Sequence, residues 1–168
     1  PISREGALVL NNVLLTTAAT TVLVGTLYPL ALEALTGEKI SVGAPYFNLT
    51  FGPLMLPLLL AMPFGPFLAW KRGDLKAVVQ RLSWVFGLAV VAILATFSFQ
   101  TKTSFAAPFG MAVGVWLVCG ALAELIDRAR FFRVPFRTAV SRLIGLPRSA
   151  FGTTLAHAGM GITVLGIV

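Results

Sequence analysis

The chain has 168 residues, of which 57% are hydrophobic and 11% charged, and its mean hydropathy is +0.90. Ordinary soluble domains carry about a quarter charged residues, so this composition excludes them and indicates an integral membrane protein. The net charge of +7 is carried by short connections between apolar runs. There it acts as a topology signal and contacts anionic membrane lipids, and we expect no nucleic-acid partner.

The two ends of the sequence predict that it is a piece of a longer polypeptide. It begins at Pro1 without an initiator methionine and stops at Val168 inside an apolar run. The first apolar run is too long for a secretory signal peptide. Cys119 is the only cysteine in the chain, so the sequence supports neither an internal disulfide nor a CxxC redox pair.

Five apolar runs are long enough, or nearly so, to cross a hydrocarbon layer of about 30 Å as helices of about 20 residues. The sequence therefore predicts an all-α integral membrane fold, a polytopic helical bundle forming a single transmembrane module over residues 1–168. The predicted spans are residues 6–32, 49–70, 82–99, 108–126 and 151–168.

Polar side chains mark the first span. Ser3 is a candidate N-cap, and Glu5 suits the positive end of the helix. The polar residues inside the span are Asn11, Asn12, Thr16, Thr17, Thr20 and Thr21. We favour interhelical hydrogen bonds for them, with a polar lining near a cofactor or substrate path as the alternative.

Glycines and prolines punctuate the next part of the chain. Residues 33–48 contain Gly37, Gly43 and Pro45 and are predicted to form a loop. The second span carries four prolines, at positions 53, 57, 63 and 66. Proline removes a backbone hydrogen bond and bends a helix, so this span is predicted to be kinked or broken. Its first part is a candidate re-entrant segment.

Charged connections separate the remaining spans. Residues 71–81 are predicted to be a basic turn, and residues 100–107 a short loop. Glu124 and Asp127 lie next to Arg128 and are expected to pair with it at the membrane interface. Residues 127–149 form a basic linker in which Arg130, Arg133 and Arg137 have helical spacing, with Phe132, Phe136, Val140 and Leu143 on another face. Two interpretations stay open, an amphipathic helix in the headgroup region or a solvated topogenic loop.

The basic residues also predict the topology. With the N-terminus in the cytoplasm, eleven of the 13 lysines and arginines lie on the cytoplasmic side, and only Lys39 and Lys102 lie outside. This is a clear positive-inside distribution. Residues 33–48 and 100–107 then face the periplasm or its equivalent.

His157 is the only histidine, and it lies inside the fifth span. An ionisable group at membrane depth is by default a functional-site hypothesis, and neutral imidazole is a good ligand for a transition metal or haem iron. It lies about 9 Å from the cytoplasmic face, six residues after Phe151. Gly161, one turn further on, leaves a low flank for a flat group, and Thr153 or Thr154 is placed to bond locally or to hold the second ring nitrogen. The alternative is a histidine that bonds a carbonyl of a neighbouring helix, among small residues that serve only packing.

Four stretches of the chain, in this order and spacing, resemble one family. They are residues 3–12 (SREGALVLNN), 25–29 (GTLYP), 40–48 (ISVGAPYFN) and 155–157 (LAH). Together they resemble the C-terminal half of the haem lyase of cytochrome c maturation, the F component of the Ccm system (CcmF/CycK type). The first and third stretches are quite specific, whereas LAH alone is weak.

The resemblance implies a multi-pass protein of the bacterial inner membrane that takes haem from a haem chaperone and attaches it to CxxCH motifs of apocytochrome c. It implies an internal b-type haem held between two membrane histidines. His157 matches one axial ligand of the haem iron, and the second lies outside this chain. A thioredoxin-like or TPR-containing maturation subunit is an implied partner, and a quinol is a candidate electron donor. The haem supports reduction of the haem being attached. The catalytic residues stay unknown, and this stretch alone is expected to be inactive as a haem lyase.

Two further hypotheses concern the side on which haem is transferred and the class of the protein. Tyr46 and Phe47 are candidates for packing on haem or on an incoming cytochrome, with an aromatic membrane-interface anchor as the favoured alternative. A transporter or channel segment and a non-catalytic membrane scaffold for a partner subunit are the competing classes. No acidic residue is expected deep in a predicted span. This weighs against a transporter or channel that couples to protons or cations.

Overall fold

The computed structural model describes residues 3–71, 73–100 and 106–168, and every regular element in these ranges is helical. The elements are α1 (Arg4–Thr36), α2 (Ala44–Ala61), the 3-10 helix η1 (Met62–Phe67), α3 (Leu75–Phe99), α4 (Ala106–Ala129), α5 (Phe136–Ile144) and α6 (Arg148–Ile167). In this part of the chain five helical stretches are long and apolar enough to cross a membrane, with α2 and η1 together forming one of them. The predicted all-α multi-pass membrane fold is confirmed.

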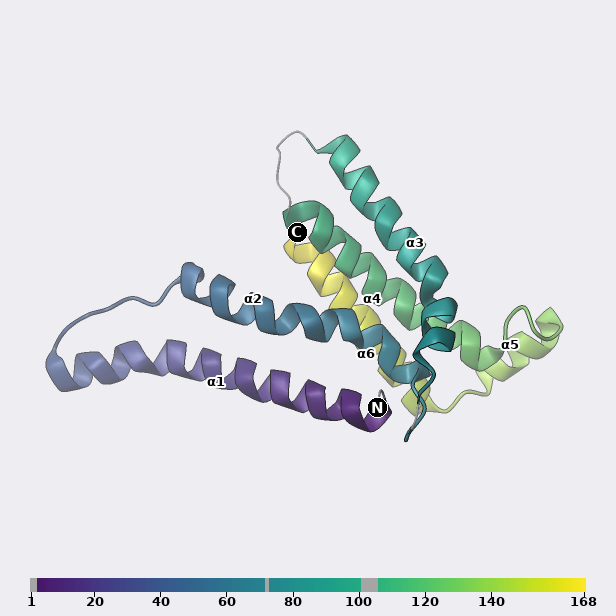
Figure 1. Ribbon diagram of the computed structural model, residues 1–168, viewed down its shortest axis with the longest axis horizontal. Helices are drawn as coiled ribbons and strands as arrows, with labels where there is room; N and C mark the ends of the chain where they lie inside the picture. The colour runs from purple at the N-terminus through teal and green to yellow at the C-terminus, as the bar shows by residue number, and fades with distance from the viewer. Residues whose placement is uncertain (1–2, 72, 101–105) are drawn as a thin grey trace.

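The helices form a hairpin and a bundle (Figure 1). Helices α1 and α2 lie side by side and antiparallel, joined at the far left of the view. Helices α3, α4 and α6 pack together, and α4 contacts both of its neighbours extensively. Helix α4 also contacts α2, η1 and α5, so it connects the hairpin to the rest of the molecule.

Helix α1 begins at the predicted cap, but it ends later than expected. The Ser3 hydroxyl accepts a hydrogen bond from the Gly6 N–H at 3.1 Å, as the sequence predicted. Gly37 has a φ of 74°, the left-handed conformation that commonly ends a helix. Pro45 lies in the first turn of α2, where a missing N–H is tolerated. The predicted loop at 33–48 is therefore too long at both ends, because Gly37 caps α1 and Pro45 belongs to the first turn of α2.

The basic turn predicted at 71–81 is also too long. Helix α3 begins at Leu75, where the Asp74 carboxylate accepts a hydrogen bond from the Ala77 N–H at 3.2 Å. Most of the predicted loop at 100–107 lies outside the described residues, as do Arg72 and Lys102, which the topology count used.

The proline-rich second span changes from α-helix to 3-10 helix after Ala61. Pro63 has no N–H to offer the preceding turn, and the Leu60 carbonyl instead accepts a hydrogen bond from the Trp116 indole at 3.1 Å. A neighbouring helix, α4, thus donates a hydrogen bond to the turn that precedes Pro63, the kind of contact by which proline-containing membrane helices are satisfied. A bend at Pro53 or Pro57 stays a prediction.

Small residues on α4 bring its neighbours into close contact. A Cβ built on Gly120 would lie 2.6 Å from the Pro63 Cβ, and one built on Gly114 would lie 2.5 Å from the Leu165 side chain. On α6, a Cβ at Gly161 would lie 2.7 Å from Val118 Cγ2. Lipid gives helices no hydrophobic reason to associate, so close packing of this kind is the main stabilising contact.

Two threonines of α1 form hydrogen bonds within their own helix rather than the favoured interhelical ones. The hydroxyl of Thr17 donates to the Val13 carbonyl at 2.8 Å, and that of Thr20 donates to the Thr16 carbonyl at 2.9 Å, both within the helix. A threonine can satisfy itself in this way because its Oγ reaches the carbonyl four residues back.

The basic linker is helical up to Ala129, where α4 ends, and again from Phe136 to Ile144 in α5. Arg130 and Phe132 have positive φ angles of 56° and 68°, and the chain turns there before α5 begins at Phe136. The predicted helical register of Arg130 with Arg137 is therefore wrong, because Pro135 disfavours helix in the residue before it. Ala139 buries α5 against the molecule, whereas Phe136 stays 73% exposed.

The contact between α4 and α6 gives a first testable prediction. Gly161→Leu should lower the stability of the fold by about 1–3 kcal/mol, since the new side chain overlaps Val118 and backbone of α4. The measurement is the thermal unfolding of the full-length protein in detergent. Gly166→Leu, on the same helix, is the control because a Cβ there meets no atom within 4 Å among the described residues. Equal unfolding temperatures for the two variants would contradict the packing role.

The hydrogen bond from the Trp116 indole to the Leu60 carbonyl gives a second prediction. Trp116→Phe should destabilise the protein by about 1–3 kcal/mol, because the Leu60 carbonyl loses its donor. We expect faster proteolysis near residues 62–67 and a lower unfolding temperature. Trp84→Phe is the control, since Trp84 is 43% exposed on α3. A Trp116→Phe variant as stable as the control would show that the indole N–H contributes little.

Candidate cofactor cavity

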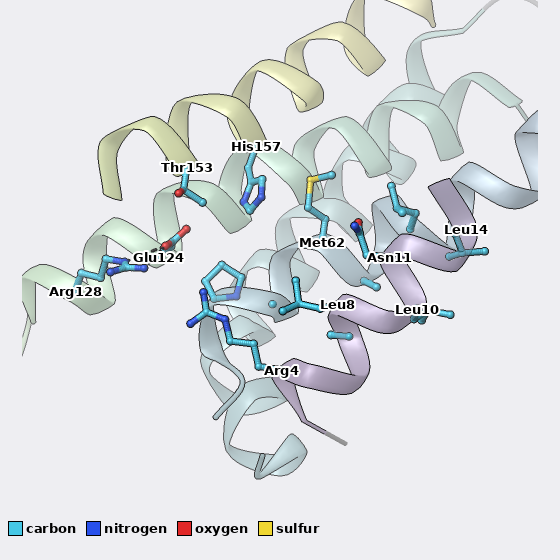
Figure 2. Close-up of a pocket in the computed structure, with 15 residues that line it drawn as sticks. Arg4, Leu8, Leu10, Asn11, Leu14, Met62, Glu124, Arg128, Thr153 and His157 are labelled. Carbon is cyan, nitrogen blue, oxygen red and sulfur yellow. Dashed lines mark hydrogen bonds and ion pairs between the residues drawn. The ribbon is translucent and has the colours of Figure 1, made fainter. Parts of the chain in front are cut away.

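A cavity of about 320 Å³ lies where four helical segments converge (Figure 2). Its walls come from the first turns of α1, the end of α2 with η1, the last part of α4 and the first half of α6. The lining residues are Arg4, Ala7, Leu8, Leu10, Asn11, Leu14, Leu58, Ala61, Met62, Gly65, Pro66, Glu124, Arg128, Thr153 and His157. Ligand sites in proteins range from about 300 to 1,000 Å³ and are mostly apolar with a few polar groups, which matches this lining.

His157 projects from α6 into the cavity (Figure 2). Its side chain is half-buried, and its imidazole makes no hydrogen bond or ion pair to any described residue. The Thr153 and Thr154 hydroxyls instead donate to the Ser149 and Ala150 carbonyls, at 3.0 and 3.1 Å. Both ring nitrogens of His157 are therefore free of protein partners in the described part of the chain.

Gly161 does not have the role that was predicted for it. It is buried against Val118 and the Gly114 carbonyl of α4 and does not line the cavity. Its small size therefore serves the packing of α6 on α4. The open side of His157 faces α1 and η1, where Met62 and Asn11 contribute to the opposite wall (Figure 2).

Glu124 is the most unusual residue in the cavity wall. It is 2% exposed, and its Oε1 receives the Arg128 guanidinium at 2.7 Å. This pairing with Arg128 confirms one prediction, and α4 turns Glu124 into the protein. Its expected place at the membrane interface stays a prediction. Its Oε2 is buried without a hydrogen-bond partner among the described residues. Asp127, by contrast, pairs with Arg81 at 3.1 Å and Arg133 at 3.8 Å and does not line the cavity.

Charge is unevenly distributed around the cavity. Arg4, Arg128 and Glu124 gather on one side of it, and Leu8, Leu14 and Met62 supply apolar surface (Figure 2). Such a lining suits an amphiphilic ligand that carries an acidic edge and an apolar body. No three His, Cys, Asp or Glu side chains gather into a metal-binding group within the described ranges, so His157 would need ligands from elsewhere to hold a metal ion.

The structure does not bring Tyr46 and Phe47 to this cavity. Both are half-buried in the first turns of α2. The Tyr46 hydroxyl donates to the Thr21 carbonyl at 3.1 Å, and its ring covers Gly25 of α1. They fasten the α1–α2 hairpin, and a role in haem transfer stays a prediction.

Sequence reasoning found His157 but not the charged groups around it. Arg4 was assigned only to topology, and Glu124 to pairing at the interface. For Asn11, helix contacts were favoured, with a lining near a cofactor or substrate path as the alternative. One signal was available for Glu124: an acidic residue four positions before Arg128 inside a span can be neutralised locally and so tolerated in the protein interior. For Arg4 and Asn11 only the approach of α1 to η1 reveals the role.

Fold and cavity define a multi-pass α-helical membrane protein with a single histidine in an internal, partly charged cavity. Comparison with known proteins then identifies its relatives. The chain is 58% identical over 168 residues to the cytochrome c-type biogenesis protein CycK of Rhizobium meliloti and 56% identical to that of Bradyrhizobium diazoefficiens, in each case over 100% of the chain. It is 35% identical over 99% of its length to the cytochrome c-type biogenesis protein CcmF of Pseudomonas aeruginosa.

The predicted resemblance to the CcmF/CycK-type cytochrome c-type biogenesis proteins is thereby confirmed. The chain spans about a quarter of the length of these curated relatives, between 24% and 26%. No family model matches the sequence, and no solved structure matches it.

Proposed function

We propose that this chain acts in cytochrome c maturation as part of a membrane haem lyase, and that His157 is one axial ligand of an internal b-type haem. The observation that carries the proposal is a half-buried imidazole without a hydrogen-bond or ion-pair partner among the described residues. It faces an internal cavity in a chain related throughout to cytochrome c biogenesis proteins. The second axial ligand would come from outside this chain.

The residues of the cavity fit such a group. Haem is a flat apolar ring with an acidic edge, and the cavity offers an imidazole, apolar surface from Leu8 and Met62, and the Arg4 guanidinium. A volume of about 320 Å³ is at the low end for a ligand site, as expected if this chain forms one wall of it. When bound between two imidazoles, haem would supply a one-electron relay that supports reduction of the haem to be attached.

The cavity residues of this chain would have separate roles in holding the haem. His157 would coordinate through one ring nitrogen, Arg4 would compensate acidic groups at the charged side, and the apolar wall would exclude water. Water exclusion and burial are among the factors that set the potential of a bound haem. Attachment of haem to apocytochrome c itself would use parts of the machinery beyond these 168 residues.

The setting follows from the same proposal. The protein would lie in the bacterial inner membrane with the N-terminal end of this chain in the cytoplasm, as the basic residues indicate. Its partners would be a haem chaperone, apocytochrome c, a thioredoxin-like or TPR-containing maturation subunit and a quinol. Exposed Phe136 and Ile144 on α5, beside Arg137 and Arg142, would rest on anionic lipid headgroups.

A transporter or channel segment is the second candidate, and the burial of Glu124 favours it. An acidic group and a histidine in one cavity are typical of proton or cation pathways. The absence of b-type haem from the purified full-length protein would favour this class over the haem lyase.

The haem proposal predicts the behaviour of a histidine variant. His157→Ala should lower the haem content of the purified full-length protein at least fivefold, because one of two axial bonds to iron is lost. The measurement is the pyridine haemochrome absorption per mole of protein. Thr153→Ala, one turn away in the same cavity wall, is the control and should keep its haem. An unchanged haem content in His157→Ala would contradict the ligand assignment and indicate that this histidine serves only packing.

A further inference from the structure

We propose that Glu124 is the hydrogen-bond acceptor for the ring nitrogen of His157 that does not coordinate iron. Glu124 would thus act as a positioning residue that fixes the imidazole and makes it a stronger ligand. The inference rests on the proposed haem function and assigns a role within it to Glu124.

The first argument is the state of the Glu124 carboxylate. Its side chain is 3% exposed, and Arg128 occupies only Oε1, through contacts of 2.7 and 2.9 Å. The buried Oε2 has no partner in the described part of the chain. Burying a polar atom without a hydrogen bond is costly, so an acceptor of this kind in a cavity wall favours a donor that occupies the cavity or borders it.

The second argument is the relative position of Glu124 and His157. Helices α4 and α6 are antiparallel, and their contacts pair Gly110 with Val168, Gly114 with Leu165, and Val118 with Gly161. Continued by four residues along each helix, this register places His157 opposite Leu122. Glu124 lies two residues further along α4, a rise of about 3 Å. Both side chains line the same cavity, and the proposed bond would form by rotation of the carboxylate toward the imidazole.

The third argument concerns the other candidate partners of His157. Thr153 and Thr154 already donate to backbone carbonyls, and Thr153 is exposed. Asn11 reaches the cavity from α1, where its amide donates to the Asn12 side chain at 3.4 Å. Only Glu124 combines burial, a negative charge and a vacant acceptor. Arg128 compensates that charge from the far side of the carboxylate without using Oε2.

The expected effect is on the reduction potential of the haem. A carboxylate that accepts the second N–H of a coordinating histidine fixes the ring and raises its basicity as a ligand. A more basic ligand stabilises oxidised iron more than reduced iron. Loss of the bond should therefore make the haem easier to reduce while the iron–His157 bond remains.

The test uses the full-length protein with Glu124→Gln, Glu124→Asp and the control Asp127→Asn. Haem content is measured first, and the midpoint potential is then measured by optical redox titration. We expect both Glu124 variants to keep their haem and to show at least a tenfold higher ratio of reduced to oxidised haem at a fixed potential. For one electron this is a shift of about 59 mV. Asp127→Asn removes a charge from the same end of α4 outside the cavity and should leave the potential unchanged.

The outcomes separate the inference from the function on which it rests. Glu124→Gln at the parent potential would overturn the inference. A shift in Glu124→Gln but not in Glu124→Asp would also overturn it, because charge alone would then explain the shift. Glu124→Asp keeps the charge that pairs with Arg128, so it provides the test if Glu124→Gln does not accumulate. Retention of haem by His157→Ala would overturn both the inference and the proposed function, whereas its loss with unchanged Glu124 variants would overturn the inference alone.

Discussion

The close approach of other helices to α4 is the contact on which the rest of the structure depends. Gly114 and Gly161 let α6 approach α4, and Gly120 lets Pro63 of η1 rest against it. In a lipid environment such packing takes the place of the hydrophobic effect. Because α6 carries His157 and η1 carries part of the opposite wall, these contacts hold two walls of the cavity against α4.

Satisfaction of polar groups by hydrogen bonds is the second constraint, and several contacts of the described residues show it. The proline-interrupted span recovers a bond through Trp116, threonines bond to carbonyls of their own helix, and the Tyr46 hydroxyl reaches Thr21. Within the described ranges, Gln100 Oε1 and Glu124 Oε2 depart from the rule, since each is buried without a hydrogen-bond partner. In a membrane protein such a departure is costly, and that of Glu124 lies in the wall of the cavity that also contains His157.

Comparison of the predicted and observed helix boundaries shows which features the sequence pattern can predict. All five spans were predicted, since continuous apolar runs bounded by charge are a strong signal. The predicted loop at 33–48 was too long because Gly37 and Pro45 suit helix ends as well as they suit loops. The arginines before Pro135 were placed in a helix because their spacing is helical, and only the backbone shows the turn with positive φ at Arg130. Local signals of this kind have more than one structural meaning, and tertiary contacts decide between them.

The sequence by itself determined that this protein is helical, crosses the membrane several times and carries one histidine in a span, because composition and periodicity report burial in lipid directly. It also determined the relation to cytochrome c biogenesis proteins. Only the tertiary structure decided that Arg4, Asn11 and Glu124 share a cavity with His157, since these residues come from helices far apart in the chain. It likewise decided that Gly161 packs against α4. Which face of a helix meets which neighbour depends on the fit of side chains across the interface, and that information is not local in the sequence.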